Sequence, residues 1–163
     1  VLPKPKQREL WQHFKWVETM FSFDGTHTKF EYQRHPAKWD TAVNTFETIL
    51  QEAHTHTSLC YTVNVFNVMY MQEFESWAQQ YNIKPYWNIA HGPAHYCIKT
   101  IPTAAKQQIA QHIPDDGIRN YMMSETGDKL AWRKFKQLTH QLDTIRNESF
   151  EQVFPELYTV LYK

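Results

Sequence analysis

The residues best suited to chemistry lie together in the segment Phe21-Ser22-Phe23-Asp24-Gly25, at the end of an apolar, β-prone run. Because side chains alternate between the two faces of a strand, Ser22 and Asp24 are expected to point to the same side, into a pocket. A hydroxyl and a carboxylate at this spacing suit the two hydroxyls of a ribose, and Gly25 would let the backbone approach a ligand closely. A simple Asp-Gly turn is the structural alternative.

Two pairs of histidines, His54-x-His56 and His91-x3-His95, have spacings that occur in metal sites, where a neutral imidazole is a common ligand. His54 and His56 precede a β-prone run, so they are expected at the end of a strand that lies away from the ligand-binding loops. His91 and His95 follow a strand and would lie at the correct end. A small histidine-dependent metalloenzyme is therefore one hypothesis, although the sequence favours the absence of a metal site.

The two cysteines, Cys60 and Cys97, are too few for a disulfide framework, and they cannot supply the three or four thiolates that a metal or an iron–sulfur cluster requires. Each is expected to be a small buried hydrophobic residue. The six tryptophans mostly fall on helical or strand faces, which predicts core packing rather than base stacking.

The charge of the chain is balanced. Its 17 Lys plus Arg against 17 Asp plus Glu give no long-range field that would attract nucleic acid or an anionic membrane, although a local patch is compatible with this balance. No apolar run approaches the ~18 residues needed to span a bilayer. We therefore expect a soluble, cytoplasmic protein that binds neither nucleic acid nor a membrane. The sequence starts with Val1, no Met precedes Met20, and residues 1–6 resemble neither a signal peptide nor a transit peptide, so we expect a fragment of a longer chain.

Hydrophobic periodicity predicts alternating strands and helices in residues 1–100. Strands are expected at 17–23, 59–66 and 86–89, and amphipathic helices at 8–15, 36–53 and 71–81. This order predicts a parallel sheet with right-handed crossovers, which three strands cannot close. The helices suffice to cover one side only. Ligands bind at the carboxyl ends of such strands, here the loops after Phe23, Phe66 and Ile89.

Residues 101–163 are expected to form an α-helical extension. Helices are indicated at about 102–112 and 130–142, and the last helix follows a capping-box pair, Ser149 and Gln152, with a kink at Pro155. The predicted fold class is therefore α/β. Residues 1–100 would form the C-terminal part of a partial (β/α) TIM-like barrel, and residues 101–163 its helical extension.

Three segments of the chain carry a resemblance to a known family. The first is Ser-Phe-Asp-Gly at a strand end, followed by Arg34 and Trp39, and the second is the run 62–67 followed by a helix with Trp77. The third is the tail, at 142–146 and 154–157. In this order they resemble the fourth and fifth strand–helix units and the C-terminal end of radical S-adenosylmethionine (radical SAM) proteins, within the group that has SPASM or twitch domains.

The resemblance implies a binding site for S-adenosylmethionine at the first strand end. Ser22 and Asp24 would contact the ribose or neighbouring atoms, with Gly25 beside them. Arg34 matches the arginine that leads into the family's fourth helix, where it would pair with the cofactor carboxylate. A solvated surface arginine is the alternative interpretation of Arg34.

Two further positions are implicated at the second strand end. The resemblance implies that Asn64 or Asn67 hydrogen-bonds the cofactor or the substrate, while capping of the loop is an equally good interpretation. The third loop, at 88–95, matches the region expected to hold the adenine.

The chain departs from the family in one decisive respect. The defining Cys-x3-Cys-x2-Cys motif and the first three strand–helix units are absent. Three thiolates leave one iron of a 4Fe-4S cluster open for S-adenosylmethionine, and two separate cysteines cannot do this. The resemblance therefore implies that the cluster ligands lie in a missing N-terminal half of the barrel, which would be the partner of this chain.

In the parent protein, the resemblance implies reductive cleavage of S-adenosylmethionine by a reduced 4Fe-4S cluster. The resulting 5′-deoxyadenosyl radical would abstract hydrogen from an unidentified substrate, for which a peptide is the family-level expectation. This chain alone is expected to be inactive. A non-catalytic α/β module that binds a peptide or protein through exposed aromatic residues is the alternative.

Overall fold

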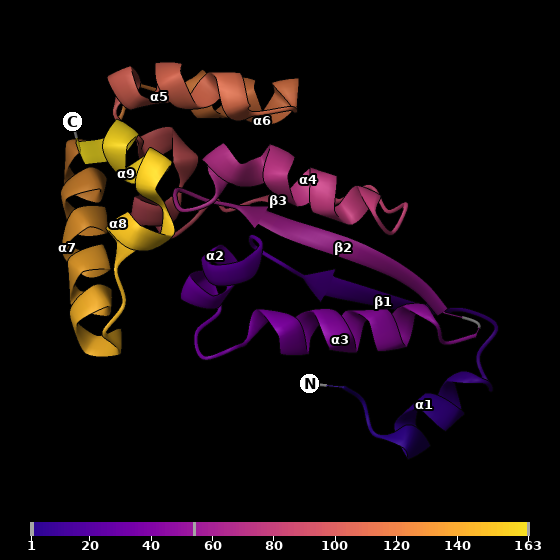
Figure 1. Ribbon diagram of the computed structural model, residues 1–163. Helices are drawn as coiled ribbons and strands as arrows, with labels where there is room; N and C mark the ends of the chain where they lie inside the picture. Colours follow the sequence, from indigo (N-terminus) through magenta and orange to yellow (C-terminus); the bar gives the residue numbers. More distant parts are fainter. Residues whose placement is uncertain (1, 54, 163) are drawn as a thin grey trace.

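The computed structural model describes residues 2–53 and 55–162, which contain a three-stranded parallel sheet. Its strands are β1 (Val17–Ser22), β2 (Thr55–Val63) and β3 (Tyr86–Ile89), in the spatial order β1-β2-β3 (Figure 1). Both neighbouring pairs of strands are parallel. The predicted α/β class, with strands and helices alternating along a parallel sheet, is confirmed.

Two amphipathic helices cover one face of the sheet, α3 (Trp39–Leu50) after β1 and α4 (Met71–Gln79) after β2. Successive right-handed crossovers in one direction place both helices on the same side. They are in contact there, because the ring of Phe46 lies 5.8 Å from that of Trp77.

The opposite face of the sheet is largely exposed. Met20 of β1 and Tyr86 of β3 expose 55% and 60% of their surfaces, and Trp16 stacks on His56 of β2 with ring centroids 5.3 Å apart. The residues of this side, which we call the open face, are Glu18, Met20, Ser22, His56, Ser58, Cys60, Thr62, Tyr86 and Asn88. The described strands thus form an open sheet with helices on one side, and they do not close into a barrel.

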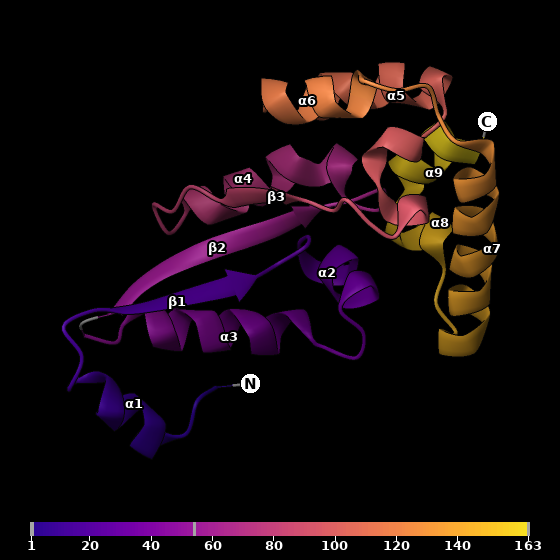
Figure 2. The same cartoon turned by 180° about the vertical axis from the view of Figure 1, so that it is seen from behind.

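The second half of the described chain is helical, as predicted, and packs at the carboxyl end of the sheet (Figures 1 and 2). Its helices are α5 (Thr103–Ile109), η4 (Ala110–His112), α6 (Asp116–Met123), α7 (Lys129–Arg146), α8 (Phe150–Val153) and α9 (Pro155–Tyr162). The ring centroid of Phe66, in the loop after β2, lies 5.1 Å from that of Phe135 in α7 and 5.7 Å from that of Phe150 in α8. A single aromatic core therefore joins the parts on either side of residue 100.

The structure differs from the sequence-based expectation in several elements. A helix, α2, takes the place of the polar loop expected after β1. It buries Phe30 against Phe23 of the strand end and Tyr32 against Phe154 of the helical extension. Strand β2 begins at Thr55, four residues before the expected start. In this added part of the strand, the hydroxyl oxygen of Thr57 lies 2.9 Å from that of Thr19 in β1. Where a kink at Pro155 was expected, α8 ends at Val153 and Pro155 begins a separate helix, α9. The remaining elements are α1 (Pro5–Trp11), α2 (His27–Gln33), η1 (Val68–Tyr70), η2 (Ala94–Tyr96) and η3 (Ile98–Thr100).

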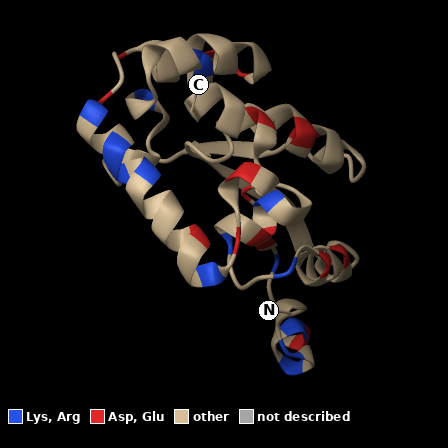
Figure 3. Ribbon diagram, turned by 60° about the vertical axis from the view of Figure 1, so that its left-hand side comes forward, with Lys and Arg blue, Asp and Glu red and all other residues tan. Residues whose placement is uncertain are grey.

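The exposed sides of the helices are charged, most of all on α7. This helix carries five Lys or Arg and a single Asp in a chain whose net charge is zero, and basic residues recur along it in Figure 3. Among residues 2–53 and 55–162, no helix is long and apolar enough to cross a membrane.

Candidate binding site at the carboxyl ends of the strands

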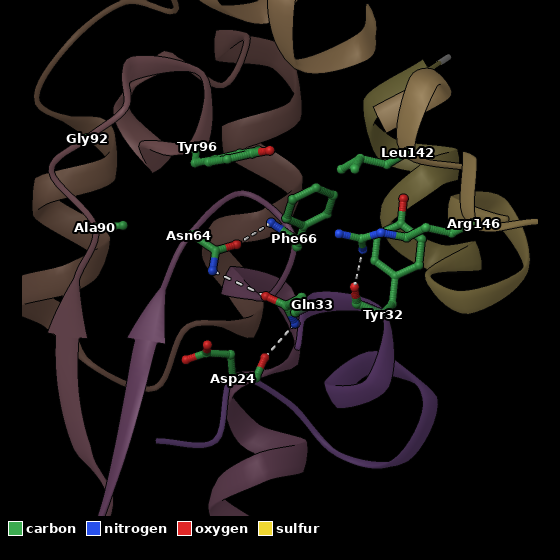
Figure 4. A pocket seen from close by; sticks show the side chains of 10 residues that line it. All are labelled: Asp24, Tyr32, Gln33, Asn64, Phe66, Ala90, Gly92, Tyr96, Leu142 and Arg146. Atoms are coloured by element: carbon green, nitrogen blue, oxygen red, sulfur yellow. Dashed lines mark hydrogen bonds between the residues drawn. The ribbon is translucent and has the colours of Figure 1, made fainter. Parts of the chain in front are cut away.

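A pocket of 240 Å³ lies at the carboxyl end of the sheet, between the strand ends and α7 (Figure 4). Each strand contributes a residue two positions beyond its last open-face residue, namely Asp24, Asn64 and Ala90. The complete lining is Asp24, Tyr32, Gln33, Asn64, Phe66, Ala90, Gly92, Tyr96, Leu142 and Arg146. The carboxyl ends of the three strands therefore meet in one pocket. The loops expected after Phe23 and Ile89 line it, whereas the segment expected as the second strand contributes Asn64 and Phe66, and the loop expected after Phe66 adds no residue to this lining.

Asp24 fastens the end of β1 to β2. Its buried carboxylate accepts a hydrogen bond from the backbone N–H of Thr62 at 3.0 Å and pairs with Nε of Arg34 at 2.6 Å. Arg34 follows α2 and lies outside the pocket lining, with its side chain partly exposed. The structure thus brings these two predicted site residues into contact with each other.

Three side-chain amides hold the first two loops together beneath the pocket. Nε2 of Gln33 and Nδ2 of Asn67 both donate to the carbonyl oxygen of Asp24, at 2.5 and 3.1 Å. Oδ1 of Asn67 accepts the backbone N–H of Asn64 at 2.8 Å, and Oδ1 of Asn64 accepts that of Phe66 at 2.8 Å. These bonds are those of loop-capping amides, which was one of the two interpretations of Asn64 and Asn67.

Ser22 and Gly25 lie outside the pocket lining. Ser22 is the last residue of β1, two residues before Asp24, and is exposed on the open face. Gly25 is buried under the first turn of α2, where a β-carbon would lie 3.2 Å from Cβ of Lys29. The absence of a side chain at Gly25 therefore lets α2 start directly beside the strand end.

The residues that line the pocket opposite the strand ends were not predicted from the sequence. Tyr32 comes from α2, Tyr96 from η2, and Leu142 and Arg146 from α7. Leu142 and Arg146 are four residues apart and thus share a helix face. This spacing was visible in the sequence, but nothing in it indicated what that face contacts.

Two tyrosines in this wall keep their hydroxyl protons. Burial raises the pKa of Tyr32, and so does the hydrogen bond of 2.8 Å that its hydroxyl donates to Oδ1 of Asp143. Burial also raises the pKa of Tyr96, although Arg146 acts in the opposite direction. Tyr96 makes no side-chain hydrogen bond within the described ranges, so its hydroxyl is free to donate to a ligand.

The two cysteines do not form a thiolate site. Both are buried, as predicted, Cys60 in β2 and Cys97 beside η2. Burial raises the pKa of the Cys60 thiol, and the charge of Asp24 adds to this effect. In residues 2–53 and 55–162, no group of three or more His, Cys, Asp or Glu could hold a metal ion. The residues present therefore do not fit a 4Fe-4S cluster.

The histidine pairs have separate surroundings. His54 lies outside the described residues, and His56 stacks on Trp16. Nδ1 of His91 lies 2.9 Å from the hydroxyl oxygen of Tyr121, whereas His95 is buried, which lowers the pKa of its imidazole. His91 and His95 have no third ligand beside them in the part of the chain that the structure describes.

A scan of the chain against protein-family models found no match, and searches of curated proteins and of solved structures found none either.

Proposed function

We propose that this chain is the C-terminal half of a radical SAM protein of the SPASM or twitch type, and that the pocket and the adjoining open face bind S-adenosylmethionine. The observation that carries the proposal is the convergence of all three strand ends on one pocket, with Asp24 and Asn64 in its lining. Parallel α/β sheets bind their ligands at this end. Of the Ser-Phe-Asp-Gly segment on which the family resemblance depends, Asp24 lines the pocket.

The size and lining of the pocket suit a part of the cofactor. Its 240 Å³ lies below the about 300–1,000 Å³ of a complete small-molecule site. Phe66 and Tyr96 offer aromatic surfaces for an adenine base, and Ala90 and Gly92 leave room beside them. The ribose would then lie near the carboxylate of Asp24, and the methionyl group would extend over the open face toward Ser22 and Arg34.

The role of this chain would be to bind and orient the cofactor and the substrate. Once cleaved at a reduced 4Fe-4S cluster, bound S-adenosylmethionine would supply the group that abstracts hydrogen from a substrate, which we propose to be a peptide. The cluster ligands would come from an N-terminal half-barrel that covers the open face. The exposed Met20 and Tyr86 support such a partner.

A non-catalytic interaction module is the second candidate. The observation that favours it is the exposure of large side chains on and beside the open face, where Trp16 is 65% exposed. A peptide or protein could bind to these side chains without any cofactor. In that case the amide-lined loops would serve only to hold the sheet and the helical extension together.

The full-length protein distinguishes the two candidates. The radical SAM proposal requires three cysteines in Cys-x3-Cys-x2-Cys spacing, within roughly 100–150 residues before Val1 on domain-size grounds. It also requires that the reconstituted cluster change its absorption or paramagnetic resonance spectrum when S-adenosylmethionine is added, because the cofactor binds the open iron. A full-length sequence without these cysteines would exclude the enzyme and leave the interaction module.

A further inference from the structure

We propose that Arg146 binds a carboxylate of the substrate that enters the pocket. This inference rests on the proposed function of the pocket as a ligand site, and it deepens that function by naming a chemical group of the substrate. The residue comes from the last turn of α7, so the helical extension would take part in substrate recognition.

The guanidinium of Arg146 has one edge free. Its Nη1 donates to the backbone carbonyl of Tyr32 at 3.0 Å, which fixes the side chain across the pocket. Figure 4 shows the guanidinium extending from α7 toward Phe66, among the side chains that line the pocket. Nε and Nη2 make no hydrogen bond to the described residues. These two N–H groups form a planar fork that matches the two oxygens of a carboxylate.

Among the described side chains of the lining, the free hydrogen-bond donors are those of Arg146 and Tyr96. The amides of Gln33 and Asn64 on the facing wall are engaged with each other, at 3.2 Å, and with the backbone. The hydroxyl of Tyr96 has no such partner among the described residues, and Tyr96 lines the same pocket as Arg146. An anion in the pocket could therefore accept hydrogen bonds from both Arg146 and Tyr96.

The charges around the pocket favour a single negative charge. Asp24 and Arg146 are the charged residues of the lining, and Asp24 is already paired with Arg34. Oε2 of Glu148 lies 3.9 Å from Nη1 of Arg146, on the side of the guanidinium that also contacts Tyr32. A phosphate dianion would find no second cation in the described lining, whereas a carboxylate needs only the free edge of Arg146.

The position of Arg146 is fixed before any ligand binds. The carboxylate of Asp143, one turn earlier in α7, accepts the hydroxyl of Tyr32 at 2.8 Å and the backbone N–H of Phe150 at 3.0 Å. These bonds hold the end of α7 against α2 and α8. A guanidinium held in this way loses little further freedom when it binds a carboxylate, which favours affinity.

Two pairs of probes test this assignment in the full-length protein. N-acetylglycine carries a peptide-like carboxylate, and N-acetylglycine amide is its uncharged counterpart; both are titrated by NMR. S-adenosylmethionine carries the methionyl carboxylate and 5′-methylthioadenosine lacks it; both are titrated by calorimetry. Arg146→Gln removes the charge, Arg146→Lys keeps the charge without the fork, and Arg133→Gln is the exposed control on the same helix. Circular dichroism establishes that each variant is folded.

We expect Arg146→Gln to weaken the binding of N-acetylglycine by about ten- to a hundredfold, as for a charge-assisted hydrogen bond, and to leave its amide unaffected. Arg146→Lys should lose less of the affinity for N-acetylglycine, because it keeps the charge. If Arg146→Gln does not fold, the affinity of Arg146→Lys tests the inference in its place. A selective loss for S-adenosylmethionine, with 5′-methylthioadenosine unchanged, would assign the bound carboxylate to the cofactor instead of the substrate.

Wild-type affinity of Arg146→Gln for both carboxylates would overturn the inference, as would a wild-type protein that binds neither carboxylate. The failure of the proposed function has a different signature. In that case the wild type would bind N-acetylglycine through Arg146 but neither of the two nucleosides.

Discussion

Replacing Asn67 with aspartate should lower the free energy of unfolding by about 3–5 kcal/mol, the range for a buried charge without a partner. Asn67 is 1% exposed, and its Nδ2 donates to the carbonyl oxygens of Asp24 and Thr62 and to Oε1 of Gln33, at 3.0 to 3.2 Å. The substitution puts a carboxylate oxygen against these three acceptors. Urea denaturation at neutral pH measures the difference from the wild type.

Two comparisons show whether the hydrogen bonds of Asn67 are responsible. Asn67→Ala should cost less, about 1–3 kcal/mol, because it mainly leaves the backbone N–H of Asn64 without its acceptor. Protonation removes the charge of the introduced carboxylate, so the deficit of Asn67→Asp should shrink as the pH is lowered toward 4. Asn44→Asp, at an exposed position of α3, is the matched control. If Asn67→Asp is as stable as this control, the amide network does not hold the loops.

Replacing Asp24 with alanine in the full-length protein should weaken the binding of S-adenosylmethionine by about ten- to a hundredfold, the effect of losing a hydrogen bond to a charged group. Two causes act together. The carboxylate would no longer accept hydrogen bonds from the ribose, and Arg34 would lose the partner that holds its Nε at 2.6 Å. Isothermal calorimetry measures the affinity.

The control for Asp24→Ala is Gln108→Ala, an exposed change on α5 far from the strand ends in sequence. Asp24→Asn retains an oxygen that can accept the N–H of Thr62, so it separates the loss of charge from the loss of the contact between β1 and β2. We expect it to bind with intermediate affinity. Equal affinities of Asp24→Ala and Gln108→Ala would remove Asp24 from the cofactor site.

The order of strands and helices, and the meeting of the three strand ends, were predictable from the sequence. The strand 86–89 was predicted with the bounds that the structure has. The convergence of Asp24, Asn64 and Ala90 follows from topology, since the carboxyl ends of parallel strands lie at one edge of the sheet.

Helix α2 and the second wall of the pocket were not predictable by the same reasoning. Helix α2 has only seven residues, too few for a clear helical period, and the polar residues at its start are typical of a loop. The contact of Tyr32 with Asp143 joins positions 111 residues apart. Such a contact depends on how the helical extension packs, which no local pattern specifies.

Lys106 shows the limit of the periodicity argument most plainly. A lysine in an amphipathic helix is expected in water. Lys106 is buried instead, and its Nζ donates to the backbone carbonyls of Lys99 at 2.7 Å and Glu125 at 2.6 Å. It thereby ties α5 to the segment between α6 and α7. The carbonyls that make this burial possible belong to distant segments, so the sequence around Lys106 could not reveal them.

The formation of 5′-deoxyadenosine tests the central claim most directly. The full-length protein, with its cluster reconstituted and reduced by dithionite, is incubated with S-adenosylmethionine, and the nucleoside is quantified by chromatography. We predict its release by the wild type, and a much lower yield from Asp24→Ala at the same cofactor concentration. A wild-type protein that carries a reduced 4Fe-4S cluster and releases no 5′-deoxyadenosine would contradict the account.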